Sequence, residues 1–496
     1  MLAAAASTLA VAQTWRVTAS ASLESTFTDN VDLAAGDQRR ADWINQLTPS
    51  VRFAETSAHT RFGGSIALPI LLYARTTENN YVAPEVAIAG TVEALDRFLF
   101  VDATVNVSQQ YQTPFGALPN NLANATNNRY TAQSYTVSPY IQGLLPNNID
   151  YALRDSNSWS VANGTGNGSG NGNAYNNQVT GHITRQASPL GWSGEYDRTY
   201  LKSDTQPYET TSIVRALALY RPDATLQLSA IVGYEDNQFV LTEERGVTYG
   251  AGGTWHPTDR TNADGRWEHR FFGSAYHFNF DHHTPLTVWS INASRDITNY
   301  PTQLANLPVG GNVPGLLNNL LLSKVPDAAQ RQQLVDQIIR ERGLPTLLQG
   351  PVILSAEQIT LVETETASFG ILGARNSILF TLFRSRNQPV PGSDLAEVTD
   401  VLTTVTDSTQ VGAGVVWTHQ LASNTTWATN LSVSRAKSHQ EPRETSDQYL
   451  LSSTVSQALS AFTSVYGGAR YQDSRSDIAQ GYREFAVFVG LSYTFH

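Results

Sequence analysis

The last twelve residues of the chain read FAVFVGLSYTFH, residues 485–496. Large apolar side chains such as Phe485, Val487 and Val489 alternate there with small or polar ones. A period of two is the pattern of a β-strand with one apolar and one polar face. The stretch therefore predicts a strand whose odd-numbered residues form the apolar face.

The same alternation recurs along the whole chain, and turn-rich stretches separate its instances. It is found at 99–109, 213–219, 226–235, 378–385, 410–418 and 427–434. Short turns rich in Pro, Asn, Asp and Ser alternate with longer connections. The longer connections are expected at 28–41, 112–128, 158–174, 300–356 and 388–403. Short turns on one side and long loops on the other are typical of a transmembrane β-barrel.

The physics of a bilayer requires such a sheet to close. An open edge in lipid would leave N–H and C=O groups unpaired, at a cost of several kcal/mol each. We therefore predict an all-β fold, a closed antiparallel transmembrane β-barrel of about 22 strands (20–24) with a long, partly helical extracellular loop. In it, the strand at 485–495 pairs with residues 15–28 and faces lipid with its odd residues. A soluble β-sandwich array or β-solenoid is the alternative, but no fixed internal repeat supports it.

Composition excludes several classes of function. The 496 residues include no Cys, so the chain forms no disulfide and offers no thiolate for catalysis or metal binding. The net charge of −11 argues against nucleic acid as a partner. No stretch approaches 18 apolar residues, so no transmembrane helix is expected.

The N-terminus reads MLAAAASTLAVAQ and ends its apolar run on a small-x-small site before Gln13. We interpret residues 1–12 as the remnant of a signal peptide whose start lies upstream, because the basic n-region is missing. A buried helix start is the alternative. Residues 13–496 are expected to form a single barrel domain.

The connection at 300–356 has helix signals of its own. Pro326 fits the first helical position, and Arg340 lies near the predicted end of the helix. Leu334 and Ile338 belong to an apolar stripe between them. A loop of this length in a compact barrel is either functional or disordered, and its helical pattern favours order. We predict that it caps the extracellular mouth or folds partly into the lumen as a constriction.

The densest polar group is WEHRFFGSAYHFNFDHH, residues 267–283. Its histidines fall on different faces of the predicted strands, which favours a polar turn over a metal site. No Gly-x-Ser-x-Gly or HExxH motif is found, so we expect no enzymatic activity, no metal and no cofactor. Strand parity shifts at FFG, residues 271–273, which a tight turn at Gly273 or a β-bulge would explain.

Charged residues near this stretch are predicted to face the lumen, because a charge on the lipid face would cost about 2–4 kcal/mol at the midplane. Such residues either bias which solutes pass or neutralise one another across strands. The lumen-lining candidates are Asp264, Arg266, Glu268, Arg270, Asn292, Asp296 and Arg470.

Four stretches resemble the PEP-CTERM-system-associated outer-membrane β-barrel family. They are TFTDNVDL at 26–33, WINQLTPSVRF at 43–53, TWHPTDRT at 254–261 and the long stretch at 267–298 that opens WEHRFF and closes NASRDIT. The resemblance implies a large outer-membrane barrel found with exopolysaccharide and exosortase systems, for which a role in polysaccharide export has been inferred. It implies no catalytic residues.

The sequence as a whole predicts a pore in the bacterial outer membrane that takes part in exopolysaccharide export. A nutrient-uptake porin, or a barrel that anchors a surface enzyme or adhesin, are the alternatives. The expected partners are the lipid bilayer and the outer-membrane assembly machinery, which would read the aromatic end of the last strand. A polysaccharide and periplasmic export components are expected as further partners.

Overall fold

A computed structural model describes most of the chain. The described residues are 14–164, 173–204, 207–239, 242–306, 312–321, 325, 331, 332, 334, 335, 338, 339, 344, 345, 348–353, 358–390, 407–440, 443–477 and 481–495. The predicted signal-peptide remnant at 1–12 lies outside them.

Strands dominate the described residues, and two short α-helices and two 3-10 turns are described over their whole length. The helices are α1 (Tyr300–Ala305) and α2 (Val313–Leu321), and the 3-10 turns are η1 (Gly36–Gln38) and η2 (Thr77–Asn79). No helix among the described residues is long and apolar enough to cross a membrane. The strands are β1 Thr14–Thr28, β2 Asp42–Thr56, β3 Thr60–Ala67, β4 Ile70–Tyr73, β5 Tyr81–Val82, β6 Glu85–Leu95, β7 Leu99–Tyr111, β8 Arg129–Leu145, β9 Ile149–Gly164, β10 Ala174–Arg185, β11 Leu190–Ser203, β12 Glu209–Tyr220, β13 Leu226–Gln238, β14 Glu243–Thr258, β15 Thr261–Arg270, β16 Gly273–His283, β17 Thr287–Thr298, β18 Thr360–Leu372, β19 Asn376–Pro389, β20 Ser408–Ala422, β21 Thr425–Ser438, β22 Thr445–Ala458, β23 Thr463–Ser476 and β24 Tyr482–Thr494.

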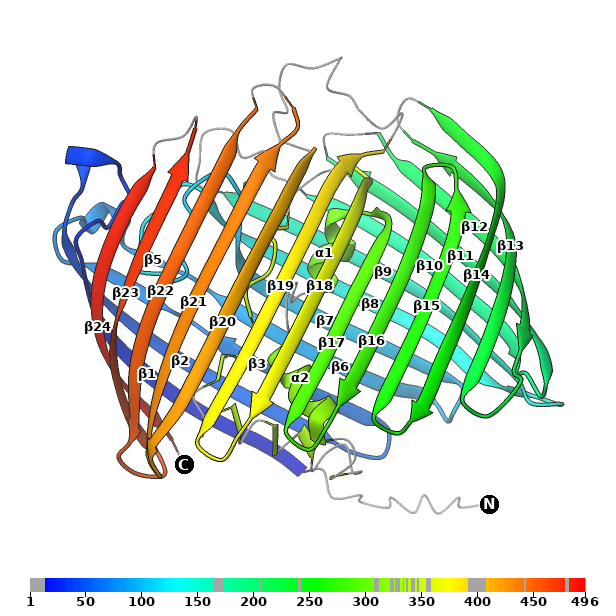
Figure 1. Ribbon diagram of the computed structural model, residues 1–496, viewed down its shortest axis with the longest axis horizontal. Coiled ribbons are helices and arrows are strands. Elements are labelled where there is room, and N and C mark those ends of the chain that lie inside the picture. The colour runs from blue at the N-terminus through cyan, green and yellow to red at the C-terminus, as the bar shows by residue number, and fades with distance from the viewer. Residues whose placement is uncertain are drawn as a thin grey trace, which may run out of the picture.

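These strands form one closed antiparallel barrel (Figure 1). Two of its strands are interrupted: β3 and β4 pair in turn with β2, and β6 and β5 pair with β3 and β4. The 24 described strands therefore make a barrel of 22, as predicted. The last strand closes it, since β24 pairs with β1 from Ser20↔Thr494 to Thr28↔Ala486. Closure leaves no sheet edge exposed to lipid.

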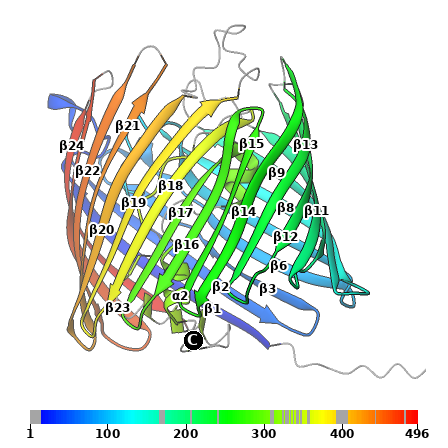
Figure 2. The ribbon, with the colours of Figure 1, turned by 45° about the vertical axis from the view of Figure 1, so that its right-hand side comes forward.

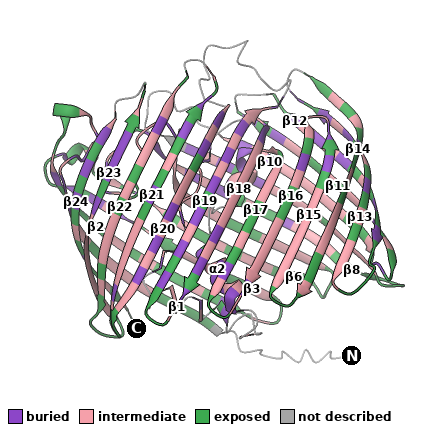
Figure 3. Cartoon of the chain, in the orientation of Figure 1, coloured by how far each residue is buried: buried purple, intermediate pink, exposed green. Residues whose placement is uncertain are grey.

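Side chains alternate between the two faces of the barrel wall, as Figure 3 shows along the strands. On β24 the odd residues Phe485 and Val489 are 47% and 60% exposed, whereas Glu484 and Ala486 are fully buried. The predicted lipid-facing parity of the last strand is confirmed. The exterior of the barrel is rich in exposed Trp, Tyr, Phe, Leu and Val side chains.

The parity shift at 271–273 is a tight turn and not a bulge. The strands β15 and β16 pair directly up to Arg270↔Gly273. Gly273 has a φ of +96°, a conformation that residues with a Cβ rarely adopt. This turn adds the strand that makes the count even.

Strand β1 begins and strand β24 ends at one end of the barrel, here called the terminus end, and the connection between β7 and β8 lies at the other, the loop end (Figures 1 and 2). One predicted boundary is wrong, because β9 continues to Gly164 and β10 begins at Ala174. Backbone pairing between β9 and β10 therefore extends into the stretch predicted as the loop 158–174.

Candidate functional site

The connection between β17 and β18, residues 299–359, is here called the lumen loop, and its helices α1 and α2 pack against the inner wall of the barrel. It leaves β17 and enters β18 at the loop end, yet its helix α2 lies near the terminus end (Figure 1). Leu316, Leu317 and Leu320 of α2 are buried against Val288 of β17 and Leu379 of β19. Of the two predicted arrangements, the structure therefore has the loop in the lumen.

Local sequence explains where the two helices begin. Asn299 caps α1, because its side chain accepts a hydrogen bond from the Thr302 amide at 3.0 Å. Asn312 accepts one from the Gly315 amide at 3.1 Å at the start of α2. Both caps are followed by a proline near the first helical position, where its missing N–H costs nothing.

The helix predicted between Pro326 and Arg340 is helical at the positions that the structure describes, 331–332, 334–335 and 338–339. Leu334 and Ile338 pack partly buried against the same apolar cluster as α2. Pro326 and Arg340, the other two candidates for a constriction, lie outside the described residues.

Polar contacts anchor the lumen loop to the wall. The hydroxyls of Tyr130 on β8 and Tyr300 on α1 lie 2.5 Å apart, and burial together with that neighbour raises the pKa of Tyr300 well above its ordinary value. The Ile359 amide donates to the Glu209 carboxylate of β12 at 2.8 Å. On the returning arm, the Gln410 side chain of β20 pairs with the backbone of Val352.

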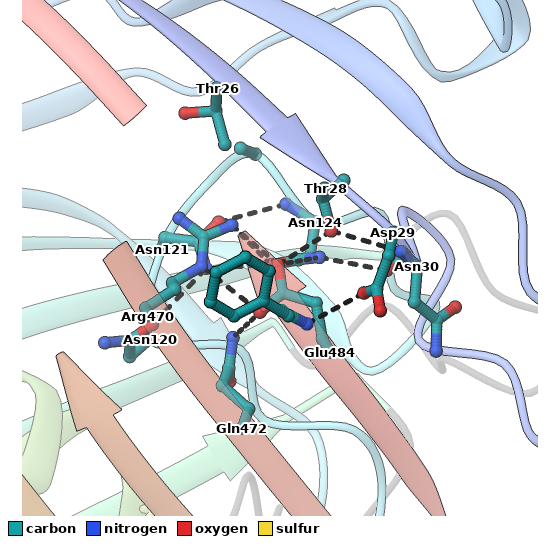
Figure 4. Close-up of polar contacts among 12 residues, drawn as sticks. Thr26, Thr28, Asp29, Asn30, Asn120, Asn121, Asn124, Arg470, Gln472 and Glu484 are labelled. Carbon is teal, nitrogen blue, oxygen red and sulfur yellow. Dashed lines mark hydrogen bonds and ion pairs between the residues drawn. The ribbon is translucent and has the colours of Figure 1, made fainter. Parts of the chain in front are cut away.

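A second connection, residues 112–128 between β7 and β8, also packs against the inner wall and is called the mouth loop. Figure 4 shows how Asn124 of this loop meets Arg470 and Glu484. The Glu484 carboxylate accepts from Thr28 at 2.8 Å, from Arg470 at 2.9 Å and from Asn124 at 3.2 Å. Arg470 and Glu484 are 4% and 0% exposed, so this ion pair is fully inside the protein. Arg470, predicted to line the lumen, instead holds the mouth loop.

Between these loops and the wall formed by β19 to β24 lie two adjoining cavities. The loop-end cavity has a volume of about 480 Å³ and the terminus-end cavity about 460 Å³. Leu348 and Gln349 of the lumen loop and Asn430 of β21 line both of them. The cavities thus follow one another along the barrel, on the side that α2 leaves uncovered.

The cavity linings combine polar and apolar groups and carry few charges, of which Arg435 and Asp473 border the loop-end cavity. None of the described residues that line the terminus-end cavity is charged. Its wall side carries hydroxyl and amide groups and Tyr466 together with the apolar Val416 and Ala428. Leu344, Pro345, Leu348 and Gln349 form its loop side. Tyr466 crosses over Gly490, where any Cβ would meet its ring, and donates to Glu24 of β1 at 3.0 Å. The polar lining residues are Thr381, Thr429, Asn430, Ser452, Thr454, Ser456 and Tyr466.

The charged candidates on β15 and β17 lie on another part of the wall and pair with one another. Arg270 contacts Glu235 at 3.0 Å and Asp296 at 2.5 Å. Arg266 contacts Glu195 at 2.8 Å and also Glu268, which in turn meets Arg215 at 2.9 Å. We call these residues the inner charge cluster. The structure therefore favours mutual neutralisation, one of the two predicted roles.

The remaining candidates lie next to this cluster. Asp264 accepts from Asn279 at 3.2 Å and lies 3.5 Å from His277. Asn292 is exposed and donates to Ser290 at 3.2 Å. Neither residue lines the two cavities.

One group of side chains that could hold a metal ion lies close together, outside the histidine-rich stretch at 267–283. Ligand atoms of His59, Glu93 and Asp96 lie within 4.8 Å of one another at turns of the terminus end. His59 and Asp96 are exposed, and exposed groups of this kind are common without a metal, so we assign no site there.

Sequence reasoning missed most of the residues that line the cavities, including Gln410 and Thr454. Parity alone predicts that the even residues of β21 and β22 face inward. Which part of the inner wall borders a cavity depends on where the lumen loop packs. No local sequence pattern predicts where the loop packs.

No protein-family model matches the chain, and no curated protein matches it. Solved structures with a similar fold include the siderophore receptor PirA from Pseudomonas aeruginosa, at 10% identity and a TM-score of 0.40, covering 97% of this chain and 80% of that one. The outer membrane protein opdK from Pseudomonas aeruginosa is 8% identical, with a TM-score of 0.37 and coverage of 97% and 99%. A BenF-like porin from Pseudomonas fluorescens Pf-5 is 8% identical, with a TM-score of 0.36 and the same coverage. At 10% identity or less, these likenesses concern the fold alone.

The barrel is that of a bacterial outer-membrane protein. It is closed, so lipid meets no unpaired backbone, and its exterior carries the apolar and aromatic side chains that a bilayer requires. Outer-membrane barrels have short periplasmic turns and longer extracellular loops, which places the loop end outside the cell.

Proposed function

We propose that the protein is a passive outer-membrane channel whose path runs along β19 to β24, between that wall and the two infolded loops. The observation that carries this proposal is the pair of adjoining cavities that share Leu348, Gln349 and Asn430. The inner charge cluster lies away from the path, and α2 fills the lumen against β17 and β19.

The lining favours uncharged, hydroxyl-rich solutes. Hydroxyl and amide groups both donate and accept hydrogen bonds, so they can replace the water around a polar neutral molecule. An ion would find no opposite charge among the described residues of the terminus-end cavity. Tyr466 and the leucines of the lumen loop add apolar surface on which a ring can lie.

The physiological role that we propose is export of a surface polysaccharide. Two observations support it: the resemblance of four stretches to an exopolysaccharide-linked barrel family, and a lining that suits sugar hydroxyls. Each cavity has the size of a small-molecule site. Passage of a polymer therefore requires the lumen loop to move.

A nutrient-uptake porin is the second candidate. The same cavity volumes favour it, because a small polar solute fits the path with the lumen loop in place. In that case the direction of flow follows the concentration gradient of the solute and needs no movement of the loop.

Two measurements test the proposal in order. Purified barrel inserted into planar bilayers should conduct ions in discrete steps, and a protein that never conducts would rule out a channel. A deletion strain of the native host is then scored for secreted and periplasmic polysaccharide. Periplasmic accumulation supports export, whereas normal secretion with impaired growth on a small solute supports uptake.

A further inference from the structure

The outer face of β21 to β24 changes from apolar to charged at the loop end. Register places Arg435 opposite Asp447, and Asp447 opposite Arg475. The Arg435 guanidinium holds both oxygens of Asp447, at 2.5 and 2.8 Å. Two residues further from the loop end on β23, Asp473 faces Arg483 of β24.

Asp473 lies between Arg475 and Arg483 and connects the cross-strand pairs. Arg475 contacts Asp473 at 2.9 Å, and Arg483 lies 3.6 Å from it. The five residues form a chain in which arginine and aspartate alternate, here called the rim cluster. Its three arginine side chains remain 59%, 63% and 59% exposed, so the ion pairs do not cover them.

The named charges on this face sum to a small positive excess of one, although the protein is acidic. With Lys437, which is exposed on the same face of β21, the rim has four cations against Asp447, Asp473 and Asp477. The comparable outer cluster on β13 and β14 consists of Arg245 with Asp236 and Glu243, and is acidic. The excess of positive charge is therefore a property of one side of the barrel, in a chain of net charge −11.

An aromatic row places the rim cluster relative to the membrane. Tyr449, Tyr471 and Phe485 lie beside it on the same strands and are 40%, 41% and 47% exposed. The Arg475 guanidinium lies 5.5 Å from the centre of the Tyr449 ring. Amphipathic rings mark the membrane–water interface, so the arginines lie at headgroup level, in the leaflet of the loop end.

We propose that the rim cluster binds the phosphate groups of a phosphorylated glycolipid of the outer leaflet, of the lipid A type. Guanidinium groups recognise phosphate through paired N–H donors, and a cationic patch at headgroup level attracts an anionic lipid. The phosphate docks on the exposed edges of Arg435, Arg475 and Arg483, beside the carboxylates of Asp447 and Asp473. The exposed guanidinium groups of this site lie on the outer face of the barrel, although Arg435 and Asp473 also border the loop-end cavity.

The test uses the full-length barrel in detergent micelles and native mass spectrometry with added diphosphoryl lipid A. A variant with Arg435→Gln, Arg475→Gln and Arg483→Gln should bind it at least about tenfold more weakly. Arg245→Gln, on the acidic outer cluster, is the matched control and should bind as the unchanged protein does. Lipid A from which both phosphates have been removed should bind the unchanged protein about as weakly as diphosphoryl lipid A binds the triple variant.

A second variant keeps the test decisive if the triple variant does not fold. Asp447→Asn with Asp473→Asn removes carboxylates and leaves every arginine, so binding should be kept or become tighter. Equal binding of both forms of lipid A, equal binding by the triple variant, or an equal loss in Arg245→Gln would each overturn the proposal. So would a loss of binding in the aspartate variant at unchanged folded yield.

Discussion

The side chain of Gln410 pairs with both backbone polar groups of Val352. Its amide nitrogen donates to the Val352 carbonyl at 2.9 Å, and its oxygen accepts from the Val352 amide at 2.9 Å. Gln410 belongs to the barrel wall and is 4% exposed, whereas Val352 belongs to the returning arm of the lumen loop. One wall residue thus holds the loop where it borders the loop-end cavity.

Gln410→Ala should loosen that arm. Loss of two buried hydrogen bonds costs on the order of 1–3 kcal/mol, because the Val352 groups are left without this partner. We expect larger and noisier single-channel conductance in planar bilayers. Gln448→Ala is the control, since Gln448 lines the same cavity and its hydrogen bond goes to Gly116 of the mouth loop instead. Equal changes in both variants would contradict the assigned role.

Deletion of residues 305–350 should open the lumen. The deletion removes α2 and its buried apolar contacts with the wall, so the space that they fill becomes available to solvent. We expect single-channel conductance to rise several-fold, with the barrel still formed by its strand ladder. Unchanged conductance would mean that the lumen loop does not restrict the path.

Glu484→Ala should destabilise the folded barrel more than any single change in the mouth loop. It leaves Arg470 buried without its carboxylate, which costs about 3–5 kcal/mol. The measurement is the temperature at which the compact band is lost on semi-native electrophoresis. A variant with both Arg470→Met and Glu484→Met should lose less, because no charge is then buried alone. A smaller loss in Glu484→Ala than in the double variant would refute this account of the ion pair.

Ion selectivity should respond to charge in the terminus-end cavity and not to the inner charge cluster. Ser452→Glu adds a carboxylate to an uncharged lining, so the reversal potential in a salt gradient should shift toward cation selectivity. Arg266→Gln with Glu195→Gln removes one contacting pair and should leave the potential almost unchanged. The opposite ranking would place the path along β11 to β15.

Much of the fold could be predicted from the sequence because each barrel strand has a period-two pattern in its own residues. The alternation at 485–495 reports which face meets lipid, and the parity shift at Gly273 reports a turn. The ladder between β24 and β1 follows, because a bilayer tolerates no open edge.

The functional site was far less accessible to sequence reasoning. Charged residues are few in this sequence, so residues such as Arg270 are natural candidates for the lumen lining. Arg270 is nevertheless neutralised across strands by Glu235. The sequence predicts that Arg470 lines the lumen, but its role depends on Glu484 and on Asn124, which lies 346 residues away in the chain. Gln410 and Thr454 carry no signal of their own, since their position beside an open cavity depends on the packing of the lumen loop.

The most direct test of the central claim is chemical access to Thr454. The chain contains no Cys, so a single Thr454→Cys substitution introduces the one reactive thiol. If the path runs through the terminus-end cavity, a bulky water-soluble methanethiosulfonate should reduce single-channel conductance in this variant. Val455 is the next residue on β22 and faces lipid, so Val455→Cys should show no change in single-channel conductance. Full conductance in Thr454→Cys after modification of its thiol has been verified by mass would contradict the proposed path.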